Sequence, residues 1–179
     1  TIKNGEPVNG GVPQAANLSA HLASLRATVP LWIPDPDWDG YAVFDFEDWT
    51  NVWDLMVAPT AGGWHSVAFQ NYSIELERRK HPSWSEAQLT AAAKTSFESA
   101  ATEWLVLSLR TCHALRPRAL WGYYGFPSEG VYDVGNSSSP MTAYAEKQLP
   151  IFRESGALYP SIYLPSGSHG KVYPWMTTE

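Results

Sequence analysis

Apolar residues along this chain follow two periods, and the order in which the periods alternate predicts an α/β fold. Runs of apolar, β-prone residues predict three strands, and helical patterns lie between them. The predicted order is a strand at 41–46, a helix at 83–115, a strand at 119–124, a helix at 143–154 and a strand at 158–164. Strands that alternate with helices in this way form βαβ units, so we expect a parallel sheet.

Capping residues set the beginnings of the predicted helices. Asn17 can cap a short helix that begins at Leu18. The run Ser83-Trp84-Ser85-Glu86 fits a capping box, which predicts that the longest helix begins at one of its two serines. The Ala-rich stretch that follows has a high helix propensity and carries this helix to about Leu115.

The composition is that of a single globular domain without a membrane span. The chain has 179 residues, 44% of them apolar, and lacks any run of about 18 apolar residues. Residues 1–16 are expected to form a loop and residues 50–70 to be irregular. Residues 1–30 lack the layout of a signal peptide, so we expect any export signal to lie upstream or to have been removed. The net charge of −6 argues against nucleic acid as a partner.

Single residue types add three smaller expectations. Cys112 is the only cysteine, so no disulfide can form within the chain, and its Ala- and Leu-rich surroundings predict a buried thiol. Asn-x-Ser sequons at Asn17, Asn71 and Asn136 are candidate glycosylation sites in a secretory context, with Asn136 in a Gly- and Ser-rich loop. Nine tryptophans and nine tyrosines supply rings that could stack on sugars, although most are expected in the core.

Two acidic residues follow the first predicted strand. Asp45 and Glu47 lie two positions apart, so strand alternation points both to one face, with Cβ atoms about 7 Å apart. Neighbouring carboxylates repel, and we expect one of them to keep its proton near neutral pH. A protonated acid beside an ionised one is what cleavage of a glycosidic bond requires. The alternative is a pair of acids that are simply solvated where a strand ends.

The other predicted strands bring two tyrosines to the same place. Tyr124 lies at the carboxyl end of the second strand, and Tyr163 lies near the carboxyl end of the third. In a parallel sheet these ends line the ligand crevice. We therefore expect both tyrosines to share one cleft with Asp45 and Glu47, which favours a ligand site over simple solvation.

Six segments spread in order over nearly the whole chain resemble the hyaluronidase family of glycoside hydrolases. They are Asn9-Gly10-Gly11-Val12-Pro13-Gln14, the run 40–49 from Gly40 to Trp49, Ser73-Ile74-Glu75-Leu76, Leu115-Arg116-Pro117, the run 120–127 from Leu120 to Pro127, and the run 157–165 from Ala157 to Pro165. The resemblance implies a TIM-like barrel with its active site at the carboxyl ends of the strands.

The resemblance also assigns roles to the candidate residues. Glu47 takes the place of the family's general acid, and Asp45 that of the aspartate that orients the substrate's N-acetyl group. The acetamido oxygen of the substrate then acts as the nucleophile, with retention of configuration. Tyr124 and Tyr163 match the family's active-site tyrosines. Tyr123 and Trp49, which stand in the same motifs, are further substrate-binding candidates. The resemblance implies neither a metal nor a cofactor.

The sequence departs from the family's pattern at three places. Phe46 stands between the two acids where the family commonly has Trp, and Thr50 stands where it commonly has Arg. After Gly-Phe-Pro the chain continues with Ser128-Glu129-Gly130, where the family usually has a cysteine paired across the loop. Glu129 adds a negative charge near a site for a polyanion, so these departures leave the substrate specificity open.

The number of strands is too small for a complete barrel. About three strands are predicted, whereas a barrel needs eight in roughly 250 residues. We therefore expect a partial (β/α)8 barrel, roughly strands 3–5 with their helices, in which 1–179 is the central part of one catalytic barrel. Residues 1–16 would lead into it and residues 166–179 would lead out. The remainder would come from the same longer protein, which we favour, or from another chain.

Three functional hypotheses follow. The first is a retaining endo-β-N-acetylhexosaminidase that hydrolyses hyaluronan or a related glycosaminoglycan by substrate-assisted catalysis, in a secreted or lysosomal setting. The second is a catalytically reduced relative that acts as a glycan-binding or structural surface glycoprotein. The third is a non-catalytic α/β interaction domain, which explains none of the matching site residues.

Overall fold

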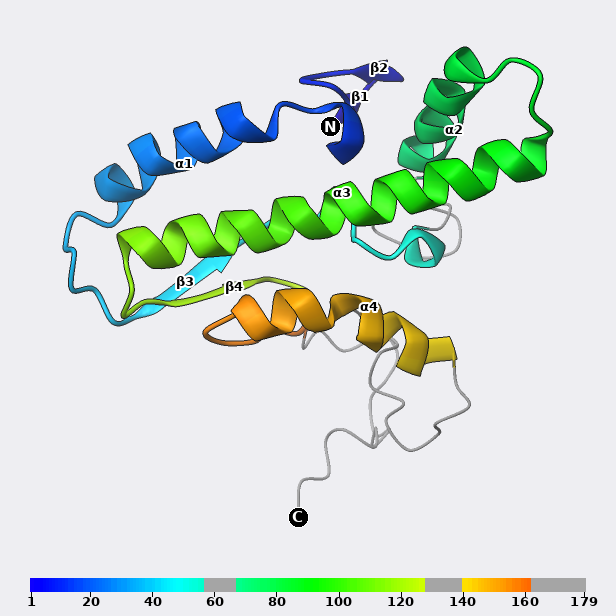
Figure 1. Cartoon of the computed structure of the whole chain (residues 1–179). Coiled ribbons are helices and arrows are strands. Elements are labelled where there is room, and N and C mark those ends of the chain that lie inside the picture. The colour runs from blue at the N-terminus through cyan, green and yellow to red at the C-terminus, as the bar shows by residue number, and fades with distance from the viewer. Residues whose placement is uncertain (57–66, 128–139, 162–179) are drawn as a thin grey trace.

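The structure, a computed structural model, describes residues 1–56, 67–127 and 140–161 (Figure 1). Its strands and helices alternate in the predicted order in the second part of the chain. The elements are β1 (Ile2–Lys3), β2 (Glu6–Pro7), α1 (Leu18–Trp32), β3 (Tyr41–Phe44), α2 (Ala68–Lys80), α3 (Glu86–Leu115), β4 (Leu120–Tyr123) and α4 (Pro140–Glu154), with short 3-10 turns η1 (Pro13–Ala15) and η2 (Trp53–Leu55).

The strands β3 and β4 form the parallel pair that the βαβ pattern predicts. Tyr41 lies opposite Leu120, and Phe44 lies opposite Tyr123. The crossover between the two strands contains α2 and α3. The rings of Phe44 and Tyr123 stack with their centroids 4.9 Å apart, which fixes the register by side-chain packing as well as by the backbone ladder.

The third predicted strand is shorter than expected in the described part of the chain. Tyr159 alone forms bridges there, one parallel to Tyr124 and one antiparallel to Phe126. It approaches β4 closely because Gly122 has no side chain: a Cβ atom at that position would lie 2.3 Å from the Ala157 carbonyl oxygen and 2.8 Å from the Tyr159 ring. The rest of the predicted strand, from residue 162, lies outside the described residues.

Local capping explains where the long helices begin. The Asn17 side chain accepts a hydrogen bond from the Ala20 amide at 2.9 Å, as predicted for the cap of α1. At α3 the capping box consists of Ser85 and Gln88, whose side chains each bond the other's backbone amide. The longest helix therefore begins after the second of the two candidate serines, and its capping box lies two residues after the one that the sequence pattern predicts.

Two predictions about irregular segments were wrong. Residues 1–16 contain the β1–β2 hairpin and the η1 turn rather than only loop, and α2 begins at Ala68 inside the range 50–70. The helix α2 is mostly polar and buries few side chains, with Phe69, Ser73 and Glu77 among them. Packing against α3 stabilises this polar helix more than burial of its own few apolar residues would.

The core is built around α3, which all the other major helices contact. In Figure 1, α1 and α2 lie on one side of α3, while the β3–β4 sheet and α4 lie on the other. The buried side chains of α3 recur every four residues as one row, which consists of Leu89, Ala93, Phe97, Ala101, Leu105 and Leu109. A row with this spacing is the ridge that helices use to pack into the grooves of their neighbours.

The two faces of the sheet differ sharply in burial. Ala42, Trp121 and Tyr123 are buried on the face that packs against the helices, whereas Tyr41 is 75% and Val43 45% exposed on the opposite face. Exposed apolar side chains in the middle of a parallel sheet are unusual, because such sheets are normally covered on both faces.

We predict that Arg116 stabilises the fold by joining the end of α1 to the end of α3. Its buried guanidinium donates from Nε to the Ile33 carbonyl at the end of α1, at 2.7 Å, and from a terminal nitrogen to the Leu115 carbonyl at 2.6 Å. Arg116→Met should lower the free energy of unfolding by about 2–3 kcal/mol, because charged hydrogen bonds are lost and the partly buried Ile33 carbonyl loses its guanidinium donor. Urea denaturation of the protein with its whole natural sequence measures this change.

Arg118→Met is the matched control. Arg118 bonds Asp39 at 3.1 Å, but both side chains are exposed, so its loss should change the free energy of unfolding by less than about 0.5 kcal/mol. Equal effects of the two substitutions would show that the buried bonds of Arg116 do not stabilise the fold.

Candidate active site

The two acidic candidates lie directly after β3. Asp45 and Glu47 follow the last strand residue, Phe44, and both side chains are exposed. They stand at the carboxyl end of a parallel strand, which is where the sequence predicts a site. Their exposure means that solvent reaches both side chains.

Tyr124 lies at the corresponding end of β4. Its amide donates to the Phe44 carbonyl at 3.0 Å, one position beyond the last pair of the parallel register. Asp45 and Tyr124 therefore occupy the next positions on the two neighbouring strands. Alternation along β4 puts Tyr124 on the exposed face of the sheet, and continuing the alternation of β3 puts Asp45 on the same face. The Tyr124 hydroxyl donates to the Ser161 hydroxyl at 3.5 Å, on the third strand segment.

Two other substrate-binding candidates, Tyr123 and Trp49, are buried in the hydrophobic core. Tyr123 is buried against α3, where its hydroxyl donates to the Leu105 carbonyl at 3.1 Å and burial raises the pKa of the phenol. Trp49 is also buried, with its ring edge-on to Phe46 and to Phe97. A substrate role for these two residues stays a prediction, but Tyr123 points away from the exposed face where Tyr124 lies, and Trp49 packs against Phe97 of α3.

The remaining candidates are distributed between described and undescribed parts of the chain. Tyr163 and Asn136 lie outside the described residues. Asn17 is exposed at the beginning of α1, and its capping oxygen leaves the side-chain nitrogen available for a glycan. Asn71 is exposed on α2, but Ser73 of the same sequon is fully buried and donates to the Phe69 carbonyl at 2.7 Å.

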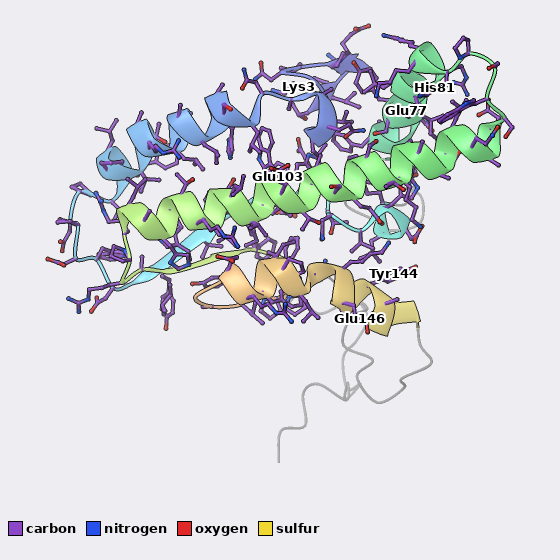
Figure 2. The ribbon with its side chains drawn as sticks, viewed as in Figure 1. Lys3, Glu77, His81, Glu103, Tyr144 and Glu146 are labelled. Carbon is purple, nitrogen blue, oxygen red and sulfur yellow. The ribbon has the colours of Figure 1, made fainter. Side chains whose placement is uncertain are left out.

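The sequence patterns do not predict a set of polar residues that line a groove between α3 and α4. Asn51, Glu98, Thr102 and Lys147 line an open groove of about 580 Å³ between α3 and α4. Figure 2 shows the side chains of these helices, with Glu103 of α3 and Glu146 of α4 labelled among those that also line the groove. The four residues come from three separate segments, so no local spacing in the sequence could have brought them together.

The described residues hold neither a metal cluster nor a membrane-spanning helix. Within 1–56, 67–127 and 140–161, no three His, Cys, Asp or Glu side chains are grouped so that they could bind a metal ion. In the same ranges, no helix combines the length and the apolar character needed to cross a bilayer.

Comparisons with known proteins identify the family. The family model described as hyaluronidase matches residues 1–176. The chain belongs to the hyaluronidase family. It is 40% identical over 173 residues to Hyaluronidase-1 of Rattus norvegicus, and 34% identical over 179 residues to a chondroitin hydrolase of Caenorhabditis elegans. The resemblance that the sequence motifs indicate to this family of glycoside hydrolases is therefore confirmed.

A solved hyaluronidase structure has a similar fold. Bee venom hyaluronidase in complex with a hyaluronic acid tetramer superposes with a TM-score of 0.79 at 28% identity, over 93% of this chain and 52% of that one. The chain spans 37% of the length of the rat hyaluronidase and 38% of that of the nematode chondroitin hydrolase. The similarity thus extends over nearly all of this chain and over about half or less of each relative.

The fully buried Cys112 gives a direct test of the packing beneath the site. Burial raises the pKa of its thiol to about 12, because the thiolate loses its hydration. We predict that native protein at pH 8 does not react with a chromogenic disulfide reagent within an hour, whereas protein in 6 M guanidinium reacts at once. Cys112→Ser protein provides the blank for any other thiol. Rapid reaction of the native thiol at pH 8 would contradict the tight packing of α3.

Proposed function

We propose that the chain carries the catalytic centre of a retaining endo-β-N-acetylhexosaminidase that hydrolyses hyaluronan or a related glycosaminoglycan. The observation that supports this most is the placement of Asp45 and Glu47, which are exposed directly after β3, with Asp45 at the position opposite Tyr124 of β4, in a member of the hyaluronidase family. Solvent-exposed carboxyl side chains directly after a parallel strand support the acid-pair role that this chemistry requires.

In the proposed reaction, Glu47 is the general acid. It donates its proton to the glycosidic oxygen as the bond to the anomeric carbon breaks. The acetamido oxygen of the same sugar bonds to that carbon and forms an oxazolinium-like intermediate, which Asp45 orients and stabilises. Water, deprotonated by Glu47, then opens the intermediate, so configuration is retained and Glu47 regains its proton.

Tyr124 and Tyr163 are proposed to bind the sugar beside the reacting bond. The Tyr124 side chain is partly buried, and its hydroxyl makes a long contact to Ser161 within the described residues, which it can exchange for a bond to a sugar group. Tyr163 follows four residues after Tyr159, the residue that bridges to Tyr124. An extended segment between them would carry Tyr163 to the same end of the sheet.

The substrate class rests on the relatives. Their names give hyaluronidase and chondroitin hydrolase, and the bee venom structure contains a hyaluronic acid tetramer. Both polymers repeat an N-acetylhexosamine, which supplies the acetamido group that the mechanism needs. The choice between them is open, since Thr50 replaces a family arginine and is itself fully buried.

The exposed face of the β3–β4 sheet supports a partial barrel. Tyr41, Val43 and Leu120 are apolar and exposed on this face. We propose that strands 3–5 of a barrel are represented here and that further strands of the same longer protein cover these side chains. The family also supports an extracellular or lysosomal setting, in which Asn17 would be a glycosylation site.

The first test measures sugar release and the role of Glu47. Protein with its whole natural sequence should release reducing ends from hyaluronan or chondroitin, and Glu47→Gln should lower kcat by 10²–10⁴-fold, the typical loss for a positioned general acid. Binding of hyaluronan oligosaccharides should be retained. Asp48→Asn, which neutralises the exposed carboxylate next in sequence, should leave kcat within about threefold.

The outcomes of this test separate the two main hypotheses. Absence of sugar release from either polymer, with oligosaccharide binding intact, would replace catalysis by the glycan-binding alternative. Turnover by Glu47→Gln above about 1% of wild type would remove Glu47 from the acid role.

The second test concerns Tyr124. Tyr124→Phe removes one neutral hydrogen bond, which is equivalent to about a 2–13-fold loss in kcat/KM. Tyr41→Phe is the matched control, because Tyr41 lies on the same exposed face at the other end of β3. Kinetics on a defined oligosaccharide compare the two variants. An equal, small effect of both substitutions would exclude a sugar contact by the Tyr124 hydroxyl.

A further inference from the structure

The segment 49–53, just after the acidic pair, is the most deeply buried loop in the described part of the chain. Trp49, Thr50, Asn51, Val52 and Trp53 are all buried, although the segment forms no strand or α-helix. A buried irregular segment must find partners for its backbone and side-chain polar groups. The hydrogen bonds that satisfy these polar groups identify a candidate residue for holding Glu47 in position.

The partners come from three helices: Gln70 of α2 donates to the Trp53 carbonyl at 2.8 Å, and the other bonds come from α3 and α4. The Trp53 amide donates to Oε1 of Glu98 on α3, at 3.0 Å. The Asn51 side-chain nitrogen donates to the Lys147 carbonyl on α4, at 2.9 Å, and to the Thr102 hydroxyl on α3, at 3.1 Å.

An ion pair joins these contacts. Lys147 Nζ donates to both carboxylate oxygens of Glu98, at 2.7 and 2.8 Å. Glu98 therefore bonds the loop and α4 at once, and Lys147 bonds the loop through its carbonyl and α3 through its ammonium. The segment 49–53 is held between two helices by one connected set of hydrogen bonds, in which removal of Glu98 breaks contacts to both sides.

The distance along the chain from these bonds to Glu47 is short. Only Asp48 separates Glu47 from Trp49, and one residue spans at most about 3.6 Å. A shift of the 49–53 segment therefore moves Glu47 with it. Misplacement of a catalytic group by about 1 Å can cost up to 10²-fold in rate.

We propose that Glu98 is a positioning residue for Glu47, acting with Lys147 to hold the 49–53 segment against α3 and α4. The inference rests on the proposed function, because it concerns the placement of the general acid. Glu98 does not reach the exposed acidic pair directly; it acts through the Trp53 amide.

We expect variants at Glu98 to keep the fold. Its side chain is 19% exposed at the α3–α4 groove, and that of Lys147 is 34% exposed, so water reaches the pair. The apolar row of α3 and the rings of Trp49 and Trp53 on Phe97 remain in every variant. A partly exposed ion pair contributes modestly to the free energy of folding. A loss of activity in a Glu98 variant therefore reports on the position of the 49–53 segment rather than on the stability of the fold.

The experiment compares two substitutions at Glu98 in the protein with its whole natural sequence. Glu98→Met removes the acceptor and the charge, and should lower kcat by about 10–100-fold with KM within twofold, since sugar binding is untouched. Glu98→Gln keeps an acceptor for the Trp53 amide and should recover kcat to within about fivefold of wild type.

Glu154→Met is the matched control. Glu154 of α4 pairs with Arg110 of α3 at 2.6 Å, so it joins the same two helices without contacting the 49–53 segment. It should leave kcat within twofold. A loss in Glu154→Met equal to that in Glu98→Met would overturn the proposal, because general loosening of α3 from α4 would then explain both. Unchanged kcat in Glu98→Met would overturn it as well.

Hydrogen exchange supplies a readout that does not need turnover. The amides of residues 49–52 are in a buried segment and none of them bonds Glu98, so they report on the segment as a whole. They should exchange at least tenfold faster in Glu98→Met and within twofold of wild type in Glu154→Met. If wild type releases no sugar, the proposed function fails, and this measurement alone decides whether Glu98 holds the segment. Unchanged exchange in Glu98→Met would overturn the holding role even in an active enzyme.

Discussion

The structure depends on the burial of one row of side chains along α3. Six residues spaced by four, from Leu89 to Leu109, are almost completely inaccessible to solvent, and the helices and the sheet are arranged around them. A helix of 30 residues is about 45 Å long, so a single element can contact both ends of the molecule. Ala93 and Ala101 within the row let neighbours approach closely, while Phe97 supplies the ring against which Trp49 and Trp53 pack. The loop that carries the acidic pair thus takes its position from the core helix rather than from its own sequence.

The elements with strong local signals could be predicted from the sequence. The strand before Asp45, the strand before Tyr124 and the long Ala-rich helix each combine composition, periodicity and a boundary residue, and all three were found close to their predicted limits. The helix α2 was missed because its few buried side chains depend on contact with α3. Its existence is a tertiary effect, which a window of residues does not contain.

The candidate site also contains features that local sequence predicts and contacts that it does not. Strand alternation predicts that the acids and Tyr124 lie at one end of a parallel pair, and the structure places Asp45 and Tyr124 at neighbouring positions there. The alternation also separates Tyr123 from Tyr124, since adjacent strand residues face opposite sides, and the structure buries the former against α3. The link between Glu98, Lys147 and Asn51 could not be predicted, because the partners lie more than 40 residues apart and meet only after the helices pack.

The close contact at Gly122 restricts the substitutions that this sequence can accept during evolution. With the Ala157 carbonyl and the Tyr159 ring against its α-carbon, position 122 accepts no larger residue unless the segment that begins near residue 157 moves aside. That segment leads toward Tyr163, so a substitution far from any carboxylate would alter the spacing of the proposed sugar-binding tyrosines. Positions 122 and 157–159 should therefore vary together among descendants of this chain, and a side chain gained at the first would have to be matched by a rearranged backbone at the others.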